Sequence, residues 1–342
     1  MEVSRQSEAV MLLTVSFGKS ESDAAHPLTP TEWGEFASWL RGRALTPVDL
    51  LKTDLSRVLE GWDHPKITLE RVRALLNRGA ALGFALEKWQ RAGLWVLTRS
   101  DRDYPKRLKK RLGWKTPPTL FGSGNRNLLN GASIAVVGGR HADQGEIDFA
   151  QRLGQRAAES GRQIVSGGAA GVDRAAMQGA LEVEGTAVGV LAHSLLRSAT
   201  SARYRQHLMS GNLALVSPFN PEARFLVGYA MARNKYIYCL AQNAIVVSST
   251  PDGGGTWNGA VENLRQGWVP LAVKQTNAPD SGNPKLVGLG ARWLTGLDDP
   301  AIHTDAVEAH TDAVEASQEQ ASQHQGAGGE SSSDAQRELG GL

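Results

Sequence analysis

The sequence predicts an α/β protein whose main part is an extended Rossmann-like, doubly wound and mostly parallel sheet, preceded by a small helical domain. Two observations support this fold class. From Ser133 onward, short apolar segments rich in Val, Ile and Ala alternate with stretches long enough for helices, an order typical of a parallel sheet covered by helices on both faces. Before that point, apolar residues recur at helical spacing over residues 30–115, which predicts a small helical bundle.

Helix-entry signals support the bundle. Thr29-Pro30-Thr31 and Thr46-Pro47 each stand just before a run of apolar residues at helical spacing, and Gly93 closes the last predicted helix. Six of the nine tryptophans lie within the first 114 residues at these spacings. We therefore expect them in the core rather than on a base-stacking surface.

Charge is distributed unevenly along the chain. Residues 1–274 hold 34 Lys and Arg against 24 Asp and Glu, whereas residues 301–342 hold one Arg and eight acidic residues. A basic body indicates a polyanionic partner, although scattered solvated charges would give the same totals. Residues 102–115 are dense in Lys and Arg, which is typical of an exposed helix face or of a phosphate-contacting patch.

The strands of the sheet are predicted from their apolar runs. These runs are residues 134–138, 163–166, 186–191, 213–216, 244–248 and 269–273. Because helices connect parallel strands, the carboxyl ends of the strands meet at one edge, where a ligand of such a sheet binds. Three glycine-rich turns follow predicted strands at this edge, and each precedes a helix: the first at residues 138–140, the second at 166–176 and the third at 248–260. Glycines let backbone N–H groups approach an anion, so these turns predict a phosphate-binding edge.

The predicted phosphate-binding residues come from these three turns and from one charged triplet. The triplet, Arg233-Asn234-Lys235, interrupts an apolar stretch that leads into a buried strand, a local conflict that often marks function. The candidate residues are Gly138, Gly139, Arg140, Ser166, Gly167, Gly168, Arg233, Asn234, Lys235, Gly253, Gly254, Gly255 and Thr256. Trp257 in the third turn is expected either to stack on a base or to anchor the turn.

Several other kinds of site are excluded by their patterns. The first turn lacks the glycine spacing of a dinucleotide fingerprint, and the chain has no P-loop and no G-x-S-x-G elbow. The eight histidines lack metal-binding spacing, so we predict no metal, no cofactor and no catalytic residues, and hence a protein that is not an enzyme. Cys239 is the only cysteine and no run of eighteen apolar residues occurs. These features indicate a cytoplasmic protein without a membrane span or signal peptide.

In their order along the chain, these motifs resemble the DNA-processing protein A family, also called DprA or Smf. The family's Gly-Ser-Arg is matched by Gly138-Gly139-Arg140, and its Ser-Gly-Leu-Ala-Arg-Gly-Ile-Asp by residues 166–173. Its Arg-Asn-Arg is matched by Arg233-Asn234-Lys235, and its Ser-Gly-Ser-Leu-x-Thr-Ala by residues 254–260. The resemblance covers roughly residues 30–275, and the helical start is similar to the family's SAM-like region.

The resemblance implies single-stranded DNA binding, a homodimer formed through the sheet domain and loading of a RecA-type recombinase. The chain departs from the family pattern where Ala170, Met177, Lys235 and Gly259 replace the usual Arg, His, Arg and Thr. We therefore expect a divergent member without the family's C-terminal winged helix. The expected organisation is an N-terminal extension (1–29), a helical SAM-like domain (30–100), a basic linker and entry segment (101–130), the Rossmann-like domain (131–300) and a disordered acidic tail (301–342).

Two alternatives stay open. The third turn also resembles the Pro-Gly-Gly-x-Gly-Thr-x-x-Glu loop of LOG-type nucleotide phosphoribohydrolases, but Gly259 stands in place of the catalytic Glu. That substitution favours a LOG- or SLOG-like nucleotide-sensing module over the enzyme. The other alternative is an interaction module that neutralises a toxin or assists phage defence. Natural transformation, recombination repair and defence are all compatible with such a domain.

Overall fold

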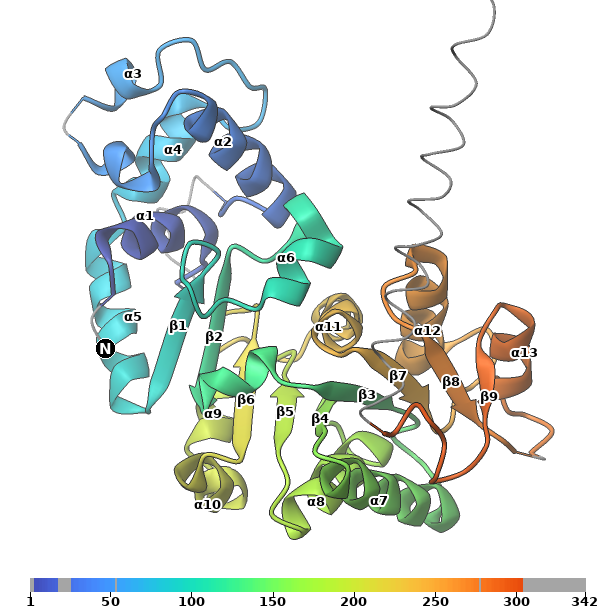
Figure 1. Ribbon diagram of the computed structural model, residues 1–342. Coiled ribbons are helices and arrows are strands. Elements are labelled where there is room, and N and C mark those ends of the chain that lie inside the picture. Colours follow the sequence, from blue (N-terminus) through green and yellow to red (C-terminus); the bar gives the residue numbers. More distant parts are fainter. Residues whose placement is uncertain (1–2, 18–25, 53, 277, 304–342) are drawn as a thin grey trace, which may run out of the picture.

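The computed structural model describes residues 3–17, 26–52, 54–276 and 278–303. Within these residues, the strands form one sheet in the order β1-β2-β6-β5-β4-β3-β7-β8-β9 (Figure 1). The strands are β1 (Leu94–Thr98), β2 (Thr119–Gly124), β3 (Ser133–Val137), β4 (Gln163–Ser166), β5 (Ala187–Val190), β6 (Leu213–Ser217), β7 (Asn243–Val246), β8 (Leu271–Lys274) and β9 (Arg292–Leu294). Neighbours run parallel from β6 to β9, whereas β1 and β2 are antiparallel additions beyond β6.

The predicted α/β fold class is confirmed, and the six predicted strands correspond to β3 through β8. One part of the expected helical region is wrong, because Leu94–Thr98 forms β1. This segment follows Gly93, is apolar, and pairs along its whole length with β2, so pairing outweighs any helical spacing. The basic linker likewise contributes β2 to the sheet. Residues 301–303 of the predicted disordered tail are described and lie against Arg162, whereas residues 304–342 lie outside the described residues.

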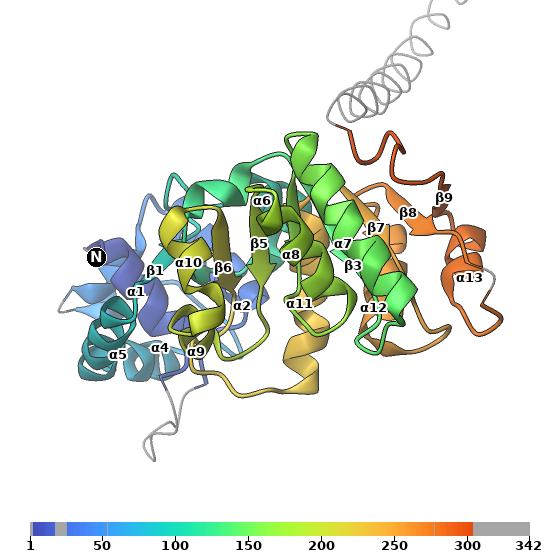
Figure 2. The same cartoon turned by 90° about the horizontal axis from the view of Figure 1, so that it is seen from below.

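Helices cover both faces of the sheet (Figure 2). They are α6 (Lys106–Leu112), α7 (Gln144–Glu159), α8 (Val172–Glu182), α9 (Leu195–Ala199), α10 (Ala202–Ser210), α11 (Val227–Leu240), α12 (Gly254–Gln266) and α13 (Asn283–Gly288). Ile134 and Val136 of β3 share a core with α7 and α8, while Ala135 and Val137 share a core with α11 and α12. Successive side chains of a strand point to opposite faces, so this double burial explains the near-continuous apolar strands.

The N-terminal helices form a separate core beside β1. They are α1 (Arg5–Thr14), α2 (Pro30–Gly42), η1 (Pro47–Leu51), α3 (Leu55–Val58) and α4 (Leu69–Leu76). The next helix, α5 (Gly79–Arg91), packs its buried Leu82 and Trp89 into the core of the sheet instead. α1 belongs to both cores, since Met11 packs with the sheet and Leu13 packs with the helices. Trp33 and Trp89 are buried as expected, but the Trp114 side chain is 54% exposed.

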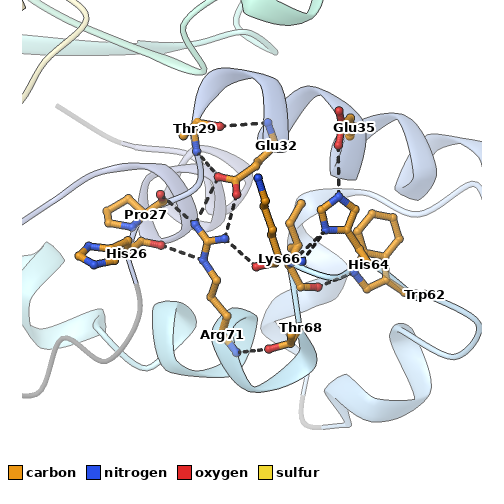
Figure 3. Close-up of polar contacts among 11 residues, drawn as sticks. His26, Pro27, Thr29, Glu32, Glu35, Trp62, His64, Lys66, Thr68 and Arg71 are labelled. Carbon is orange, nitrogen blue, oxygen red and sulfur yellow. Dashed lines mark hydrogen bonds and ion pairs between the residues drawn. The ribbon is translucent and has the colours of Figure 1, made fainter. Parts of the chain in front are cut away.

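Arg71 ties the start of α2 to α4 (Figure 3). Its guanidinium donates to the carbonyls of His26, Pro27 and Lys66, and to the Glu32 carboxylate. Glu32 in turn accepts from the Thr29 N–H, 2.8 Å away, and completes the capping box of α2. One arginine therefore orders a helix cap and three loop carbonyls that lack regular partners.

The last described segment is held against the amino-terminal ends of the parallel strands. The buried Arg162 donates to the carbonyls of Ser133, Ala301 and His303. Asp299 accepts from Arg292, from Thr295 and from the Ala301 N–H. Burial alone would raise the pKa of Asp299, but the hydrogen bonds from these groups hold it well below its ordinary value.

Asp299→Asn is expected to destabilise the fold at pH 7 and to have less effect in acid. A depressed pKa in the folded state means that the ionised carboxylate contributes stability above its unfolded pKa of about 3.9. That stability is lost as the pH falls through the lower folded value. Thermal unfolding at pH 7 and pH 3, followed by circular dichroism, measures the difference. Asp298→Asn, which alters a neighbouring exposed carboxylate, is the control, and a pH-independent penalty for Asp299→Asn would contradict the assignment.

Candidate nucleic-acid interface

The glycine-rich turns after β3 and β7 are joined at the carboxyl edge of the sheet. The Thr256 hydroxyl donates to the Gly138 carbonyl over 2.9 Å, and the Gly139 N–H donates to the Ser248 hydroxyl over 3.2 Å. β3 and β7 are neighbours at the point where the strand order reverses, the place where doubly wound sheets bind ligands. Two of the turns predicted from the sequence therefore lie in contact in the structure.

The turn after β4 is fastened to the turn after β3 by Asp173 of α8. This side chain is 6% exposed, and its carboxylate accepts from the N–H groups of Gly138, Gly167 and Ala169. Burial raises the pKa of Asp173, while Arg233 and the three N–H groups oppose that rise. Asp173 thus spans two turns from beneath, using N–H groups that would otherwise lack partners.

Arg233 of α11 lies under the turn after β4. Its side chain is buried, and its Nη1 stands 3.9 Å from Oδ2 of Asp173. A Cβ at Gly167 would overlap the Arg233 guanidinium, so a larger residue in this turn would have to displace the cation. Burial lowers the pKa of Arg233, and Asp173 counteracts the effect. The guanidinium therefore adds positive potential beneath the turn without reaching solvent.

Gly171 closes the contact between the first two turns. Its φ of +82° belongs to the region that favours glycine. A Cβ at this position would overlap the Gly139 carbonyl oxygen, and the next residue, Val172, donates its N–H to that same oxygen over 3.3 Å. The turns pack too closely for any other side chain.

The turn before α12 is held by α11. Asn234 donates from Nδ2 to the Gly255 carbonyl over 2.8 Å, and Trp257 is 8% exposed within the core. Trp257 is therefore an anchor of the turn rather than a base-stacking surface. A Cβ at Gly259 would stand 3.2 Å from both Asn234 and Tyr238, so a larger residue at this position would press against α11.

Two predicted residues lie away from the exposed part of this edge. Ser166 is fully buried, and its hydroxyl donates to the Val136 carbonyl over 2.6 Å. Lys235 lies two residues after Arg233 and so faces another side of α11, where its charged neighbours are Glu262 and Lys115. Burial lowers the pKa of Lys235. A contact of either residue with DNA stays a prediction that this placement does not favour.

The exposed part of the edge consists of a cation, an aromatic ring and an imidazole. Arg140 is exposed, with its guanidinium carbon 5.7 Å from the centre of the Phe225 ring. Phe225 is 47% exposed and meets the His193 ring edge to face at 5.3 Å. Burial lowers the pKa of His193, and the nearby Arg140 and Arg233 lower it further. An exposed cation thus lies over a partly exposed aromatic ring at this edge.

Three residues of this edge were not predicted from the sequence. Asp173 had a signal, since it is the last residue of the motif at residues 166–173. His193 and Phe225 follow β5 and β6 in loops without a glycine pattern. The Ser194 N–H donates to the Ala223 carbonyl over 2.9 Å and joins these loops, which no local pattern predicts.

Metal-site and membrane-span features do not occur in the described part of the chain. Across the described ranges, no three His, Cys, Asp or Glu side chains are grouped as a metal site requires. The helices within the same ranges do not include one both long and apolar enough to cross a membrane.

Comparison with known proteins places the chain beside DNA-processing proteins. A model of the family described as DNA recombination-mediator protein A matches residues 95–304. DNA processing protein DprA of Bacillus subtilis is 26% identical over 219 residues, which cover 63% of this chain and 72% of that protein. Protein Smf of Escherichia coli is 32% identical over 141 residues, covering 40% of this chain and 37% of that protein. The chain therefore spans most of one relative and about a third of the other.

Solved structures show the same fold. DNA processing protein A from Streptococcus pneumoniae superposes with a TM-score of 0.64 at 19% identity, covering 87% of this chain and 97% of that one. A structure of DNA processing protein A from Helicobacter pylori, which concerns its single-stranded DNA binding mode, superposes with a TM-score of 0.50 at 22% identity. It covers 60% of this chain and 92% of that one.

Arg233→Met is expected to reduce the free energy of unfolding by about 3–5 kcal/mol, because it leaves Asp173 buried without its cation. Adding Asp173→Asn should recover part of the loss. Lys235→Met on the same helix is the matched control and should cost much less. Urea unfolding followed by circular dichroism measures all three variants. A double variant no more stable than Arg233→Met would show that the ion pair does not hold the turns.

Arg140→Ala is expected to raise the pKa of His193, because it removes one of the two cations that disfavour the imidazolium. NMR titration of the His193 ring protons measures this change. Arg152→Ala, on an exposed position of α7, should leave the pKa unchanged. An unaltered His193 titration in Arg140→Ala would contradict the placement of Arg140.

Proposed function

The chain belongs to the DNA recombination-mediator protein A family of DNA-processing proteins, and we propose that it binds single-stranded DNA at the carboxyl edge of its sheet. The observation that carries the proposal is the juxtaposition of Arg140 and Phe225. Their separation of 5.7 Å places an exposed cation next to an accessible aromatic ring. A nucleotide strand presents the complementary pair, a phosphate and a base, at every step.

The phosphate part of the proposed site is Arg140 with the turns beneath it. The Arg140 side chain is exposed and forms no ion pair within the described residues, so it is available to an anion. Arg233 lies buried behind the turn after β4 and contributes positive potential there. Low-dielectric surroundings increase the effect of a fixed charge on a phosphate at the surface.

The base part of the proposed site is Phe225. Its ring meets His193 edge to face and has the Arg140 guanidinium over it, and the residue is still 47% exposed, so a base can reach the ring. Aromatic side chains stack on any base, and within this arrangement nothing presents a side-chain pattern that reads base edges. We therefore expect binding that depends weakly on nucleotide sequence.

We further propose that the bound strand is transferred to a recombinase and that the protein forms a homodimer. The family's description as a recombination mediator supports transfer of the bound strand to a RecA-type recombinase. A homodimer formed through the sheet domain would place two such edges on one particle and increase avidity. Stimulation of recombinase filament growth on coated single strands would test the transfer, and sedimentation would test the dimer.

Arg140→Ala and Phe225→Ala are expected to weaken binding of labelled oligo-dT in different ways. Arg140→Ala should lower the slope of log affinity against log salt by about 0.7, because one phosphate contact is lost. Phe225→Ala should leave the slope unchanged and cost about 1–3 kcal/mol, because a stacking contact is lost. Fluorescence anisotropy over a range of salt concentrations separates the two effects.

Arg152→Ala provides the control for a general change in charge. Wild-type affinity and slope in both site variants would contradict the proposal. Tighter binding of mononucleotides than of oligo-dT would favour a nucleotide-sensing module instead.

A further inference from the structure

A second basic surface lies at the opposite edge of the sheet. It is a groove of about 460 Å³ between the segment before α6 and the 3₁₀ helix η3 (Arg126–Asn130). Four cationic side chains line it, together with two asparagines and one carboxylate. The cations are Arg102, Lys106, Arg107 and Arg126. Arg107 donates to the carbonyls of Gly131 and Leu240, just before β3 and β7 begin, so the groove faces the amino-terminal ends of those strands.

The walls of the groove are fastened to each other. Asn130 accepts from the Lys106 N–H over 3.1 Å and donates to the Asp103 carbonyl over 3.3 Å. Arg126 pairs with the Asp103 carboxylate over 3.1 Å. The single carboxylate of the groove is thus used by one cation. A site whose walls are held in place loses less entropy when a ligand binds.

The remaining positive charge is not neutralised within the protein. Over the described ranges, Arg102, Lys106 and Arg107 form no ion pair. Two more arginines stand near Arg107 and also bond to carbonyl oxygens rather than carboxylates. Arg111 donates to the carbonyls that end α11, and Arg162 donates to those of Ser133, Ala301 and His303.

The crowding of these arginines has an electrostatic cost. Burial, followed by the neighbouring Arg107, lowers the pKa of Arg162 to about 10, and burial with Arg107 also lowers the pKa of Arg111 to about 10. Burial lowers the pKa of Arg107 as well. Cations gathered without counter-charges repel one another, and a bound polyanion would relieve that repulsion.

We propose that this groove is a second site for the phosphodiester groups of single-stranded nucleic acid, with Arg102 and Lys106 as the direct contacts. The inference rests on the proposed function in taking the same ligand, but it concerns other residues. β3 joins the two edges, and its five residues extend about 17 Å. A single strand of several nucleotides is long enough to bridge a separation of this order.

The test is the salt dependence of dT35 binding by the full chain carrying Arg102→Ala and Lys106→Ala. Both side chains are exposed and hold no structural bond, so the fold should be unaffected. We expect at least fivefold weaker binding at low salt and a slope reduced by about 1.4, for two phosphates lost. Arg102→Lys with Lys106→Arg should restore both values. Arg57→Ala with Arg73→Ala removes the same charge from the N-terminal helices and should leave the slope near wild type.

The outcomes separate this inference from the function proposed for the other edge. If Arg140→Ala reduces the slope of log affinity against log salt and the groove variant does not, the second site alone is overturned. If the groove variant reduces this slope and Arg140→Ala does not, the carboxyl-edge site alone is overturned. The final measurement is thermal unfolding in the presence of sodium pyrophosphate. Stabilisation that the groove variant abolishes, together with unchanged dT35 binding, would identify a site for free phosphates and overturn the nucleic-acid assignment.

Discussion

The buried pair of Asp173 and Arg233 is the interaction on which the carboxyl edge depends. Asp173 binds N–H groups from two turns, and Arg233 supplies a positive charge beside this carboxylate that opposes the rise in its pKa caused by burial. An ion pair so deeply buried contributes little to net stability, but removing one member leaves a charge stranded. The pair therefore makes the arrangement of the turns specific. Gly171 is required because a side chain there would overlap the backbone of the neighbouring turn, and Gly167 leaves room for the guanidinium beneath its turn.

Some residues of the carboxyl edge hold the turns in place, and others are exposed at its surface. Ser166, Asn234, Thr256 and Trp257 use their polar atoms or rings to hold the turns together. The exposed residues come from loops after three different strands and meet only at the surface. A rigid base under a small accessible set of side chains is the arrangement that binding sites require. Most residues recognised by motif are therefore supports, and the exposed set joins one motif residue, Arg140, to a residue that no motif marks, Phe225.

Both edges of the sheet carry positive charge, but the cations are held differently at each. At the carboxyl edge, one buried cation is matched by Asp173 and one exposed cation is not. At the amino-terminal edge, several arginines bond to backbone carbonyls and keep their charge. Bonds to neutral oxygens satisfy the N–H groups without cancelling the field. The same arginines fasten the final segment and α11 to the sheet, so structural and electrostatic roles coincide.

By itself, the sequence determined the fold class, the six central parallel strands and the glycine-rich turns, because apolar runs and glycine spacing are local properties. Leu94–Thr98 escaped prediction because its strand state depends on pairing with Thr119–Gly124. Tertiary structure alone decided which predicted residues are exposed. Arg233 and Lys235 stand two residues apart in one charged triplet, yet helical geometry turns the first beneath the site and the second away from it. Phe225 meets Arg140 only because parallel strands bring their carboxyl ends to a common edge.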